Sequence, residues 1–554
     1  MSLHPQTSFE IPEQTRNVAQ VAFPNGNRYM QMRDELGTIY TDEMFAHLYP
    51  ERGQPAQAPW RLALVTLMQF AENLTDRQTA DAVRARIDWK YALSLELDDP
   101  GFDFSVLTAF RKRLLEGDEE RLLFDQMLKL FKEKGLVKAG GRQRSDSTHI
   151  LGAVRNLNRL EIVGETLHHA LNILAQVDPV WLRSVIQQSD QPEAEWFEYY
   201  ARRFNDFRLP KAKGKRLEIA ERVGRDGQHL LDALFASSAP TYVSKLPAVD
   251  ILRQVWIQHY YVENDVLTWR DQKNFPPSAR MIASPYDVEV RYSKKRHMSW
   301  RGYKVQLSET CNEAQPYLIT HVETTPATDQ DVTAVKPIHE GLAGCGLLPK
   351  EHLVDGAYMS SDLLVESAQD YSVDLVGPVR LDKSWQALTE GAFSLSEFHL
   401  DWDLEVAQCP EGKLSRSWNP ARGPRGKPTI QVQFRKQDCL ACDARVRCTR
   451  SKHGPRELTL HPQPQHRALE AARERQETKV YQKQYAARAG VEGTISEAVF
   501  ALGMRRTRYR GLAKVHLQHL MTASAINLNR VLRWFDGVPR SKTYRSPFAR
   551  LALT

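Results

Sequence analysis

Long hydrophobic runs are missing from this sequence of 554 residues. None approaches the roughly 18 consecutive apolar residues that a membrane-spanning helix needs, so we expect no membrane span. The first thirty residues are polar and contain acids, and they lack the charged start and apolar middle of a signal peptide. With only six cysteines in such a chain, we expect a soluble cytoplasmic protein whose thiols stay reduced.

Acidic residues are scarce in two parts of the chain. From 501 to 554 there are eleven Lys and Arg against Asp536 alone, a net charge of +10 that exceeds the +7 of the whole chain. From 409 to 456 there are twelve basic residues against three acids, a net charge of +9. Concentrated basic blocks in an otherwise balanced chain are typical of contact surfaces for a polyanion, and the nucleic-acid backbone is the simplest candidate. The alternative is a pair of merely solvated surfaces.

Helical patterns dominate the first part of the chain. Residues 1–50 show little periodicity, so we expect a partly ordered arm. An apolar helical pattern begins at Trp60, and Thr75 with Gln78 forms a capping-box pattern for a second helix. A third helix, after Ser105, carries Arg111 and Lys112. Three short helices ending in a basic one resemble a helix-turn-helix DNA binder, although a plain helical bundle fits the spacing equally well.

Strand patterns appear in two separated segments. The first, RQRSDSTHILGAV, has Asp146 in its middle, where a charge is unfavourable unless it faces solvent or binds a metal. Several helical patterns follow from about 155 to 275. Strand signals return at Arg301 and continue to a short strand that ends on Asp355. Three strands, a helix, a strand, a helix and a strand are the order expected of a ribonuclease H-like sheet.

Four of the six cysteines lie in the first basic block: Cys409, Cys439, Cys442 and Cys448. Two cysteines separated by two residues can hold one ion from a single turn, and two more complete a tetrahedral thiolate site. The pattern predicts a structural Zn²⁺ site, with four free thiols as the alternative.

The stretch YAARAGVEGTISEAVFALGMRRTRYRGLAK carries Tyr485, Arg488 and Glu492 at offsets of three and four. On a helix these side chains share one face, next to a strongly basic segment. Arg488 and Glu492 are either an ordinary surface ion pair or part of an active site.

Taken together, these pieces resemble a bacterial insertion-sequence transposase of the DDE type, in the branch whose last acid lies in a Tyr-x2-Arg-x3-Glu-x6-Lys signature. The resemblance rests on RSDSTHI, SPYDVEVRYSKKRHMSWRGYKVQLSETC, HLVDGAYMSSDLL, the CPEG-to-CxxC segment and the Glu492 stretch. It implies a ribonuclease H-like catalytic domain, Mg²⁺ or Mn²⁺, and a catalytic triad of Asp146, Asp355 and Glu492. It also implies that Tyr485 and Arg488 contact DNA near the cleaved phosphate.

The resemblance also sets the expected organisation and partners. The fold class is α/β with large helical parts. The expected boundaries are an arm at 1–50, a helical DNA-binding domain at 51–135, catalytic parts at 136–154, 281–390 and 466–535, a helical insertion at 155–280, a basic cysteine-containing insertion at 391–465 and a basic tail at 536–554. The expected partners are terminal-repeat and target DNA and, in the synaptic complex, a second copy of the chain; nucleoid association follows from the DNA.

One position departs from the signature, because Val499 stands where it has lysine. The predicted DNA contacts nearby are the basic residues Arg505, Arg506, Arg508, Arg510 and Lys514. Glu497 competes with Glu492 for the role of third acid but lacks the matching Tyr and Arg. The competing function is a non-catalytic DNA-binding protein derived from a transposase.

Overall fold

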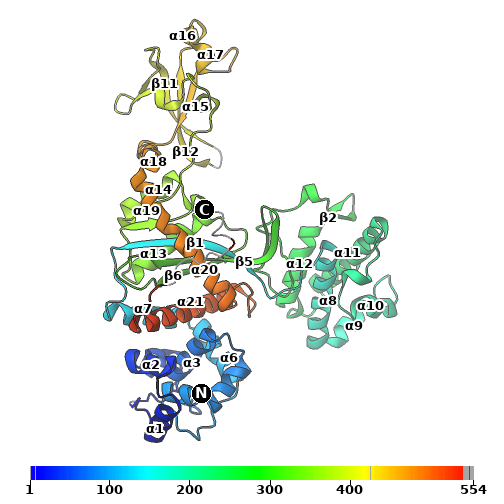
Figure 1. The fold of residues 1–554 in the computed structure, drawn as a ribbon. Helices are drawn as coiled ribbons and strands as arrows, with labels where there is room; N and C mark the ends of the chain where they lie inside the picture. Colours follow the sequence, from blue (N-terminus) through cyan, green and yellow to red (C-terminus); the bar gives the residue numbers. More distant parts are fainter. Residues whose placement is uncertain (1, 7, 424–425, 541–547, 549–554) are drawn as a thin grey trace.

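The computed structural model describes residues 2–6, 8–423, 426–540 and 548, and it has a mixed α/β fold that is about half helical. One six-stranded sheet forms its centre (Figure 1), with strands in the order β4-β5-β1-β7-β8 and β6 also paired to β5. Their bounds are β1 Arg142–Leu151, β4 Arg291–Lys295, β5 Met298–Thr310, β6 Ile319–Pro326, β7 Glu351–Leu353 and β8 Asp374–Val376.

The register of this sheet places the two predicted aspartates side by side. β1 runs parallel to β7, with Arg144 opposite Leu353. Asp146 and Asp355 each follow two residues later, and neighbouring strands lie about 5 Å apart, so the two residues stand at the same level of the sheet. On its other side β1 is antiparallel to β5, with Asp146 opposite Leu307.

β5 bends where it leaves β1. A Cβ at Gly302 would lie 2.0 Å from the carbonyl oxygen of Ile150, so only glycine allows this approach of the two backbones. Beyond the bend, β5 pairs with β4 in a hairpin that the strand patterns did not predict.

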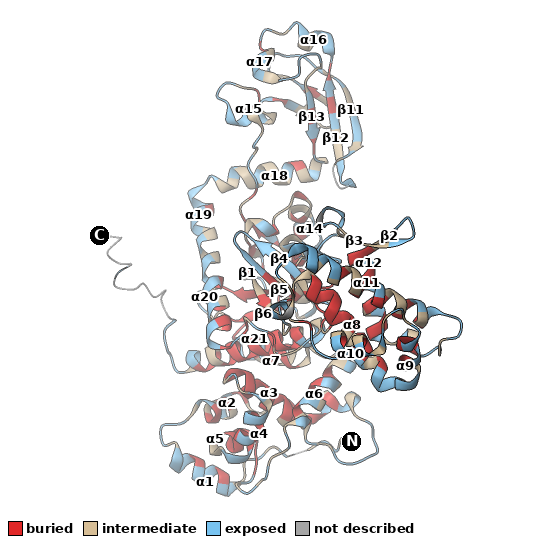
Figure 2. Cartoon of the chain, turned by 90° about the vertical axis from the view of Figure 1, so that its right-hand side faces the viewer, coloured by how far each residue is buried: buried red, intermediate tan, exposed pale blue. Residues whose placement is uncertain are grey.

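The N-terminal helices pack onto helix α21 (Leu512–Phe535), which lies between them and the sheet. This long helix contacts β6 on one side and α3 on the other, and one buried hydrophobic cluster runs through all three layers (Figures 1 and 2). The predicted capping box of Thr75 and Gln78 is confirmed. The helices are α1 Glu13–Ala22, α2 Arg28–Leu36, α3 Pro59–Ala71, α4 Asp76–Ala85, α5 Ile87–Ala92, α6 Ser105–Glu116 and α7 Leu122–Glu133.

Residues 1–50 differ from the expected partly ordered arm. They contain α1, α2 and a 3-10 helix at Asp42–Leu48, and Tyr29, Met32 and Phe45 are buried in the main core. Amphipathic segments this short give a weak sequence pattern, and burial against α5 and α21 supplies their stability.

Two insertions have hydrophobic clusters of their own. The helical insertion contains α8 Arg159–Val177, α9 Pro179–Gln187, α10 Glu193–Tyr200, α11 Lys213–Phe235 and α12 Pro247–His259, which enclose one cluster. The sequence predicted helices from about 155 to 275, but residues Tyr260–Glu263 form strand β2, paired to β3 (Val266–Trp269). β-Branched and aromatic residues at Tyr260, Tyr261 and Val262 favour this extended conformation.

The cysteine-bearing insertion projects from the sheet at the far end from the N-terminal helices (Figure 1). It consists of α15 Trp385–Leu388, β9 His399–Asp401, β10 Val406–Gln408, β11 Ser415–Arg422, β12 Pro428–Phe434, α16 Lys436–Leu440, α17 Arg445–Cys448 and β13 Glu457–Leu460, around a small hydrophobic cluster. The chain returns to the sheet through α18 Gln463–Gln476 and α19 Lys479–Ala486. Two further helices, α13 Val335–Gly344 and α14 Ser361–Tyr371, connect β6, β7 and β8.

None of the helices in the described parts of the chain is both long and apolar enough to cross a bilayer.

Candidate active site

Arg488 lies among the three predicted acids. Its Nη2 is 2.5 Å from Asp146 Oδ2, and its Nη1 is 3.3 Å from Glu492 Oε1. The Arg488 and Asp146 side chains are 15% and 17% exposed, whereas Glu492 is 64% exposed. Asp355, the third acid, is close enough to interact electrostatically with both Asp146 and Arg488. The fold thus gathers residues that are hundreds of positions apart in the sequence.

Local hydrogen bonds orient the two aspartates. Asp146 Oδ1 accepts a hydrogen bond of 2.8 Å from the backbone N–H of Ser147, and Asp355 Oδ1 accepts one of 2.7 Å from that of Gly356. Each carboxylate therefore keeps its second oxygen for another partner. In Asp146, Arg488 takes that oxygen.

Burial and charge oppose each other at this site. Burial raises the pKa of Asp146 despite the neighbouring Arg488 guanidinium, and the negative charge of Asp355 adds to the rise. Burial lowers the pKa of Arg488, but the charges of Asp146, Asp355 and Glu492 outweigh it, so that the pKa is raised overall. Burial also raises the pKa of Tyr485, whose ring stacks on Tyr481 with centroids 5.5 Å apart.

The helix that carries Glu492 is irregular on both sides of it. The sequence predicted one helical face for Tyr485, Arg488 and Glu492. Instead a 3-10 turn, Ala487–Ala489, separates α19 from α20 (Gly490–Ser496), and a π-helical turn, Glu497–Ala501, follows. Arg488 and Glu492 nevertheless still meet. Val499, at the position of the signature lysine, is buried and faces away from solvent.

Glu497, the rival third acid, belongs to a different cluster. Its Oε2 is 2.8 Å from Arg530 of α21, and Arg530 also pairs at 2.8 Å with Glu309, which is fully buried in β5. Arg144 of β1 pairs with the same Glu309 at 2.6 Å. Thr494 donates to Glu309 at 2.6 Å, so the cluster fastens α20 to the sheet. These contacts give Glu497 a structural role and favour Glu492 as the acid of the site.

The two glycines that flank Glu492 have different surroundings. A Cβ at Gly490 would lie 2.0 Å from Nη1 of Arg144, whereas nothing lies within 4 Å of one at Gly493. Arg144 Nη1 also donates to the carbonyl oxygen of Ala487 at 2.5 Å, so Gly490 makes room for a buried guanidinium that holds the helix.

We expect Gly490→Ala to lower the free energy of unfolding by about 1–3 kcal/mol, because the buried Arg144 guanidinium must move. Gly493→Ala is expected to raise it by about 0.5–1 kcal/mol, since alanine has the better helix propensity and meets no neighbour. Urea unfolding of both variants measures the difference. Equal effects at the two positions would contradict a special role for Gly490.

The predicted DNA-contacting residues divide into exposed and buried groups. Lys112, Arg506, Arg510 and Lys514 are exposed. Arg505 is half-buried and donates to Thr148 Oγ1 at 3.0 Å and to the carbonyl oxygen of His149. Of the basic tail predicted at 536–554, residues 541–547 and 549–554 lie outside the described residues.

Two of these predictions are corrected by the structure. Arg111 is only 7% exposed and pairs with Asp76 at 2.5 Å. Arg508 donates to Asn73 Oδ1 at 2.5 Å and to the carbonyl oxygen of Leu74 at 2.8 Å, and its guanidinium covers the ring of Phe70. Arg111 therefore holds two N-terminal helices together, and Arg508 holds the N-terminal helices to the C-terminal segment. Neither guanidinium is available to DNA in this arrangement.

The sequence did not predict that a basic hairpin tip lies near Asp146. Lys294, Lys295 and Arg296 stand exposed at the turn between β4 and β5, and the charge of Lys295 acts on Asp146. The signal was present as SKKRH, but sequence alone did not show that the fold brings Lys295 close enough to act on Asp146. We call residues 294–296 the basic hairpin tip.

Buried histidines lie beneath the strands that carry the aspartates. His352 Nε2 is 2.6 Å from Ser145 Oγ, and its Nδ1 is 2.9 Å from His339 Nε2. Burial lowers the pKa of His339 and His516 to about 4 and that of His519 to about 3, and it holds the pKa of His352 well below the ordinary value.

This arrangement predicts acid lability. A histidine whose pKa is lower in the folded state than the roughly 6.5 of the unfolded chain stabilises the fold above pH 6.5, and that contribution is lost as the pH falls. Between pH 6.5 and 5 each such histidine should lower the free energy of unfolding by about 2 kcal/mol, which corresponds to about 1.4 kcal/mol per pH unit. Unfolding at a series of pH values tests this, with His339→Asn expected to reduce the slope. A stability that does not change over this range would contradict neutral buried histidines.

The four cysteines of the projecting insertion form no disulfide and lie on one small hydrophobic cluster. Backbone N–H groups of Lys413 and Arg456 donate to the sulfurs of Cys409 and Cys439 at 3.3 and 3.5 Å. Burial raises the pKa of the Cys448 thiol to about 11, and the other three cysteines add to the rise.

In the part of the chain that the structure describes, no three or more His, Cys, Asp and Glu side chains form a group that could hold a metal ion. This applies both to the four cysteines and to the three acids. At the acids, Arg488 already occupies the oxygen of Asp146 that a metal would need.

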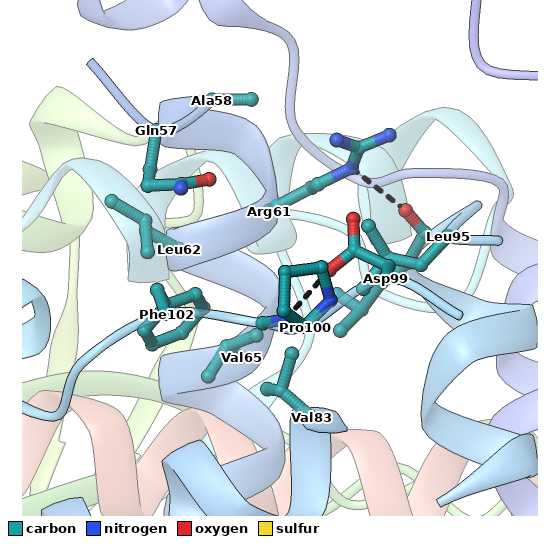
Figure 3. Close-up of a pocket in the computed structure, with 12 residues that line it drawn as sticks. Gln57, Ala58, Arg61, Leu62, Val65, Val83, Leu95, Asp99, Pro100 and Phe102 are labelled. Carbon is teal, nitrogen blue, oxygen red and sulfur yellow. Dashed lines mark hydrogen bonds between the residues drawn. The ribbon is translucent and has the colours of Figure 1, made fainter. Parts of the chain in front are cut away.

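A separate pocket lies among the N-terminal helices (Figure 3). Apolar side chains of α3, Val83 and Phe102 line most of it, with Arg61 and Asp99 as its charged groups. Burial lowers the pKa of Arg61, and its guanidinium donates to the backbone of Leu93 and Ser94. None of the predicted site residues lines this pocket, so the acids remain the candidate site.

Comparisons with known proteins give two family matches. Residues 18–113 match a family described as a transposase domain (DUF772), and residues 408–532 match a transposase DDE domain. The second match includes the four cysteines, Glu492 and most of α21, and the first crosses the boundary expected at residue 50. No curated protein matches the chain. The two matches indicate a DDE-type transposase.

Proposed function

We propose that the protein is a DNA transposase of the branch with the Tyr-Arg-Glu-Lys signature, which cleaves the terminal inverted repeats of an insertion sequence and joins the ends to target DNA. The single observation that carries this proposal is the meeting of Asp146, Asp355 and Glu492 around one arginine. The sheet supports it: leaving β4 aside, three antiparallel strands are followed by two parallel ones, with an aspartate in the first strand and another just after the fourth, as the proposed ribonuclease H-like fold requires.

The chemistry of the three acids suits a divalent metal. Carboxylate oxygens are the ligands that Mg²⁺ and Mn²⁺ prefer, and the guanidinium of Arg488 marks the place where these acids stabilise positive charge. Asp146, Asp355 and Glu492 would hold the metal. When bound, two such ions activate the attacking oxygen and stabilise the leaving oxygen in phosphoryl transfer.

The remaining residues of the site position the DNA. Arg488 presents a planar guanidinium suited to a phosphate, and Tyr485 lies one helical turn before it. Exposed cations extend from the site along the basic hairpin tip, and Arg506 and Lys514 add others. Because Val499 is buried, these cations take the role of the signature lysine.

The basic hairpin tip should contribute to the salt dependence of DNA binding. Replacing Lys294, Lys295 and Arg296 by glutamine is expected to lower the log–log slope of affinity against salt by about 2–3 units, since each lost phosphate contact removes about 0.9. Fluorescence anisotropy at several salt concentrations measures the slope. The matched control replaces Lys211, Lys213 and Lys215, three exposed lysines of the helical insertion. Equal slopes for the two triple variants would remove the hairpin from the interface.

Several parts of the proposal follow from the reaction. The helices at 51–135 would bind the terminal repeats, although Arg111 is not free to do so. Synapsis of two DNA ends calls for a homodimer, and the DNA places the protein at the nucleoid in the cytoplasm. Structural zinc at the four cysteines stays a prediction from their spacing, because the described residues contain no group that could hold a metal ion.

The test uses purified full-length protein and a labelled duplex from the end of the element that encodes it. With Mg²⁺ or Mn²⁺ we expect nicks at the element boundary and joining of the 3′ ends to a supercoiled plasmid, and none of either with EDTA. A scrambled duplex of the same composition is the control. Tight binding of the end duplex without any cleavage would support the alternative, a non-catalytic DNA-binding protein.

A further inference from the structure

An arginine side chain fills the space between the acids of the site. The guanidinium of Arg488 contacts Asp146 and Glu492, and it supplies the positive charge that the three acids need. A metal ion at the same place requires the Asp146 oxygen that Arg488 occupies, and in the described chain the acids do not form a group that could hold a metal. Arginine and metal therefore compete for one oxygen.

We propose that Arg488 is a displaceable internal cation, which closes the acid site of the DNA-free protein and moves to a DNA phosphate when DNA binds. Metal loading is then coupled to DNA binding. This inference rests on the proposed function, because it takes the three acids as the metal ligands and DNA as the substrate.

Arg488 is held by few contacts. Its Nε is buried and has no hydrogen-bond partner among the described residues, so part of the guanidinium is left unsatisfied. The contact to Glu492 is long, at 3.3 Å, and that acid is mostly exposed. A phosphate offers a guanidinium two parallel charge-assisted hydrogen bonds, which can satisfy the Nε that is unpaired here.

The backbone around Arg488 allows its side chain to move without the helix. Arg488 lies in the 3-10 turn between α19 and α20, and the carbonyl oxygen of Ala487 is held at 2.5 Å by Arg144. Arg144 is in turn fixed by Glu309. The anchored segment keeps Glu492 in place while the arginine side chain exchanges one anion for another.

Coupling of this kind has a chemical advantage. Two divalent ions held permanently by these acids would promote cleavage of any DNA that reached them, whereas a site closed by its own arginine is assembled only on the substrate. The alternative is that Arg488 is a permanent structural partner of Asp146, which would make the site unable to accept a metal with or without DNA.

Binding of Mn²⁺, followed by electron paramagnetic resonance, tests the inference without any measure of activity. We expect full-length wild-type protein to bind Mn²⁺ at least about tenfold more tightly with the end duplex than without it. Arg488→Gln should bind Mn²⁺ about tenfold more tightly than wild type in the absence of DNA, and DNA should add little. Arg488→Lys keeps a cation at the site and should behave like wild type in the DNA-free state.

Lys295→Gln is the matched control, because it removes a nearby positive charge that acts on Asp146 without touching its carboxylate. If Lys295→Gln tightens DNA-free Mn²⁺ binding as much as Arg488→Gln does, general electrostatics explain the effect and the internal cation is refuted. Equal Mn²⁺ affinity of wild type and Arg488→Gln also refutes it, while leaving the proposed function intact. Absence of Mn²⁺ binding in every variant, with and without DNA, overturns the metal site and with it the proposed function.

Discussion

Replacing Asp146 by asparagine is expected to reduce DNA cleavage at least about a thousandfold, equivalent to about 4 kcal/mol of transition-state stabilisation. Asparagine keeps the shape of the side chain and an oxygen that can accept from Arg488, so the fold should survive. It removes the charge that a divalent metal requires, and with it the stabilisation of the reacting phosphate. The measurement is the single-turnover rate of nicking of the end duplex, with anisotropy as a check that the variant still binds DNA.

The same assay separates the two glutamates. Glu492→Gln should lose cleavage to a similar extent and keep normal stability, because Glu492 is 64% exposed and makes one long ion pair. Glu497→Gln should keep most of its cleavage and lose some stability, because its carboxylate pairs with Arg530 at 2.8 Å. The reverse result, with Glu497 needed for chemistry and Glu492 dispensable, would move the third ligand to the π-helical turn.

The sequence predicted those parts of the site that depend on local pattern. The strand with Asp146, the strand before Asp355 and the helical segment with Glu492 each follow from apolar periodicity and turn residues over a few positions. The strand order then predicted that the two aspartates lie close together. Their proximity comes from the parallel register of β1 and β7, which no local pattern specifies.

Other features depend on partners that are distant in the chain. The sequence predicted Arg111 and Arg508 as DNA contacts, but Arg111 pairs with Asp76 and Arg508 donates to Asn73. Gly490 leaves the space that holds Arg144, a neighbour that comes from β1 and that the local sequence does not reveal. Each error has the same physical cause: the charge or size of a residue is visible in the sequence, whereas the side chain that compensates it is brought in by the tertiary fold.

Replacing Glu309 by alanine is expected to lower the free energy of unfolding by about 3–5 kcal/mol, because two arginines would lose a shared buried partner. Glu309 is fully buried, and the side chains of Arg144 and Arg530 are only 6% and 19% exposed. Without the carboxylate, two guanidinium groups face each other in a site of low polarity. The midpoint of urea unfolding measures the loss, with the m-value as a check that the transition is comparable.

Asp374→Asn is the matched control, since it removes a carboxylate that pairs with Arg475 at 2.8 Å where both side chains are more than one third exposed. We expect less than about 1 kcal/mol there, the usual range of a surface ion pair. A loss at Glu309 no larger than at Asp374 would show that solvent reaches the buried cluster.

The Glu309 variant also links stability to chemistry. Thr494 donates to Glu309, and Arg144 holds the carbonyl oxygen of Ala487, so the carboxylate fixes the segment on both sides of Glu492. Because displacement of a catalytic group by about 1 Å can reduce a rate a hundredfold, Glu309→Ala should cleave DNA slowly even under conditions where it is fully folded. Normal cleavage by the folded variant would mean that Glu492 is positioned by other contacts.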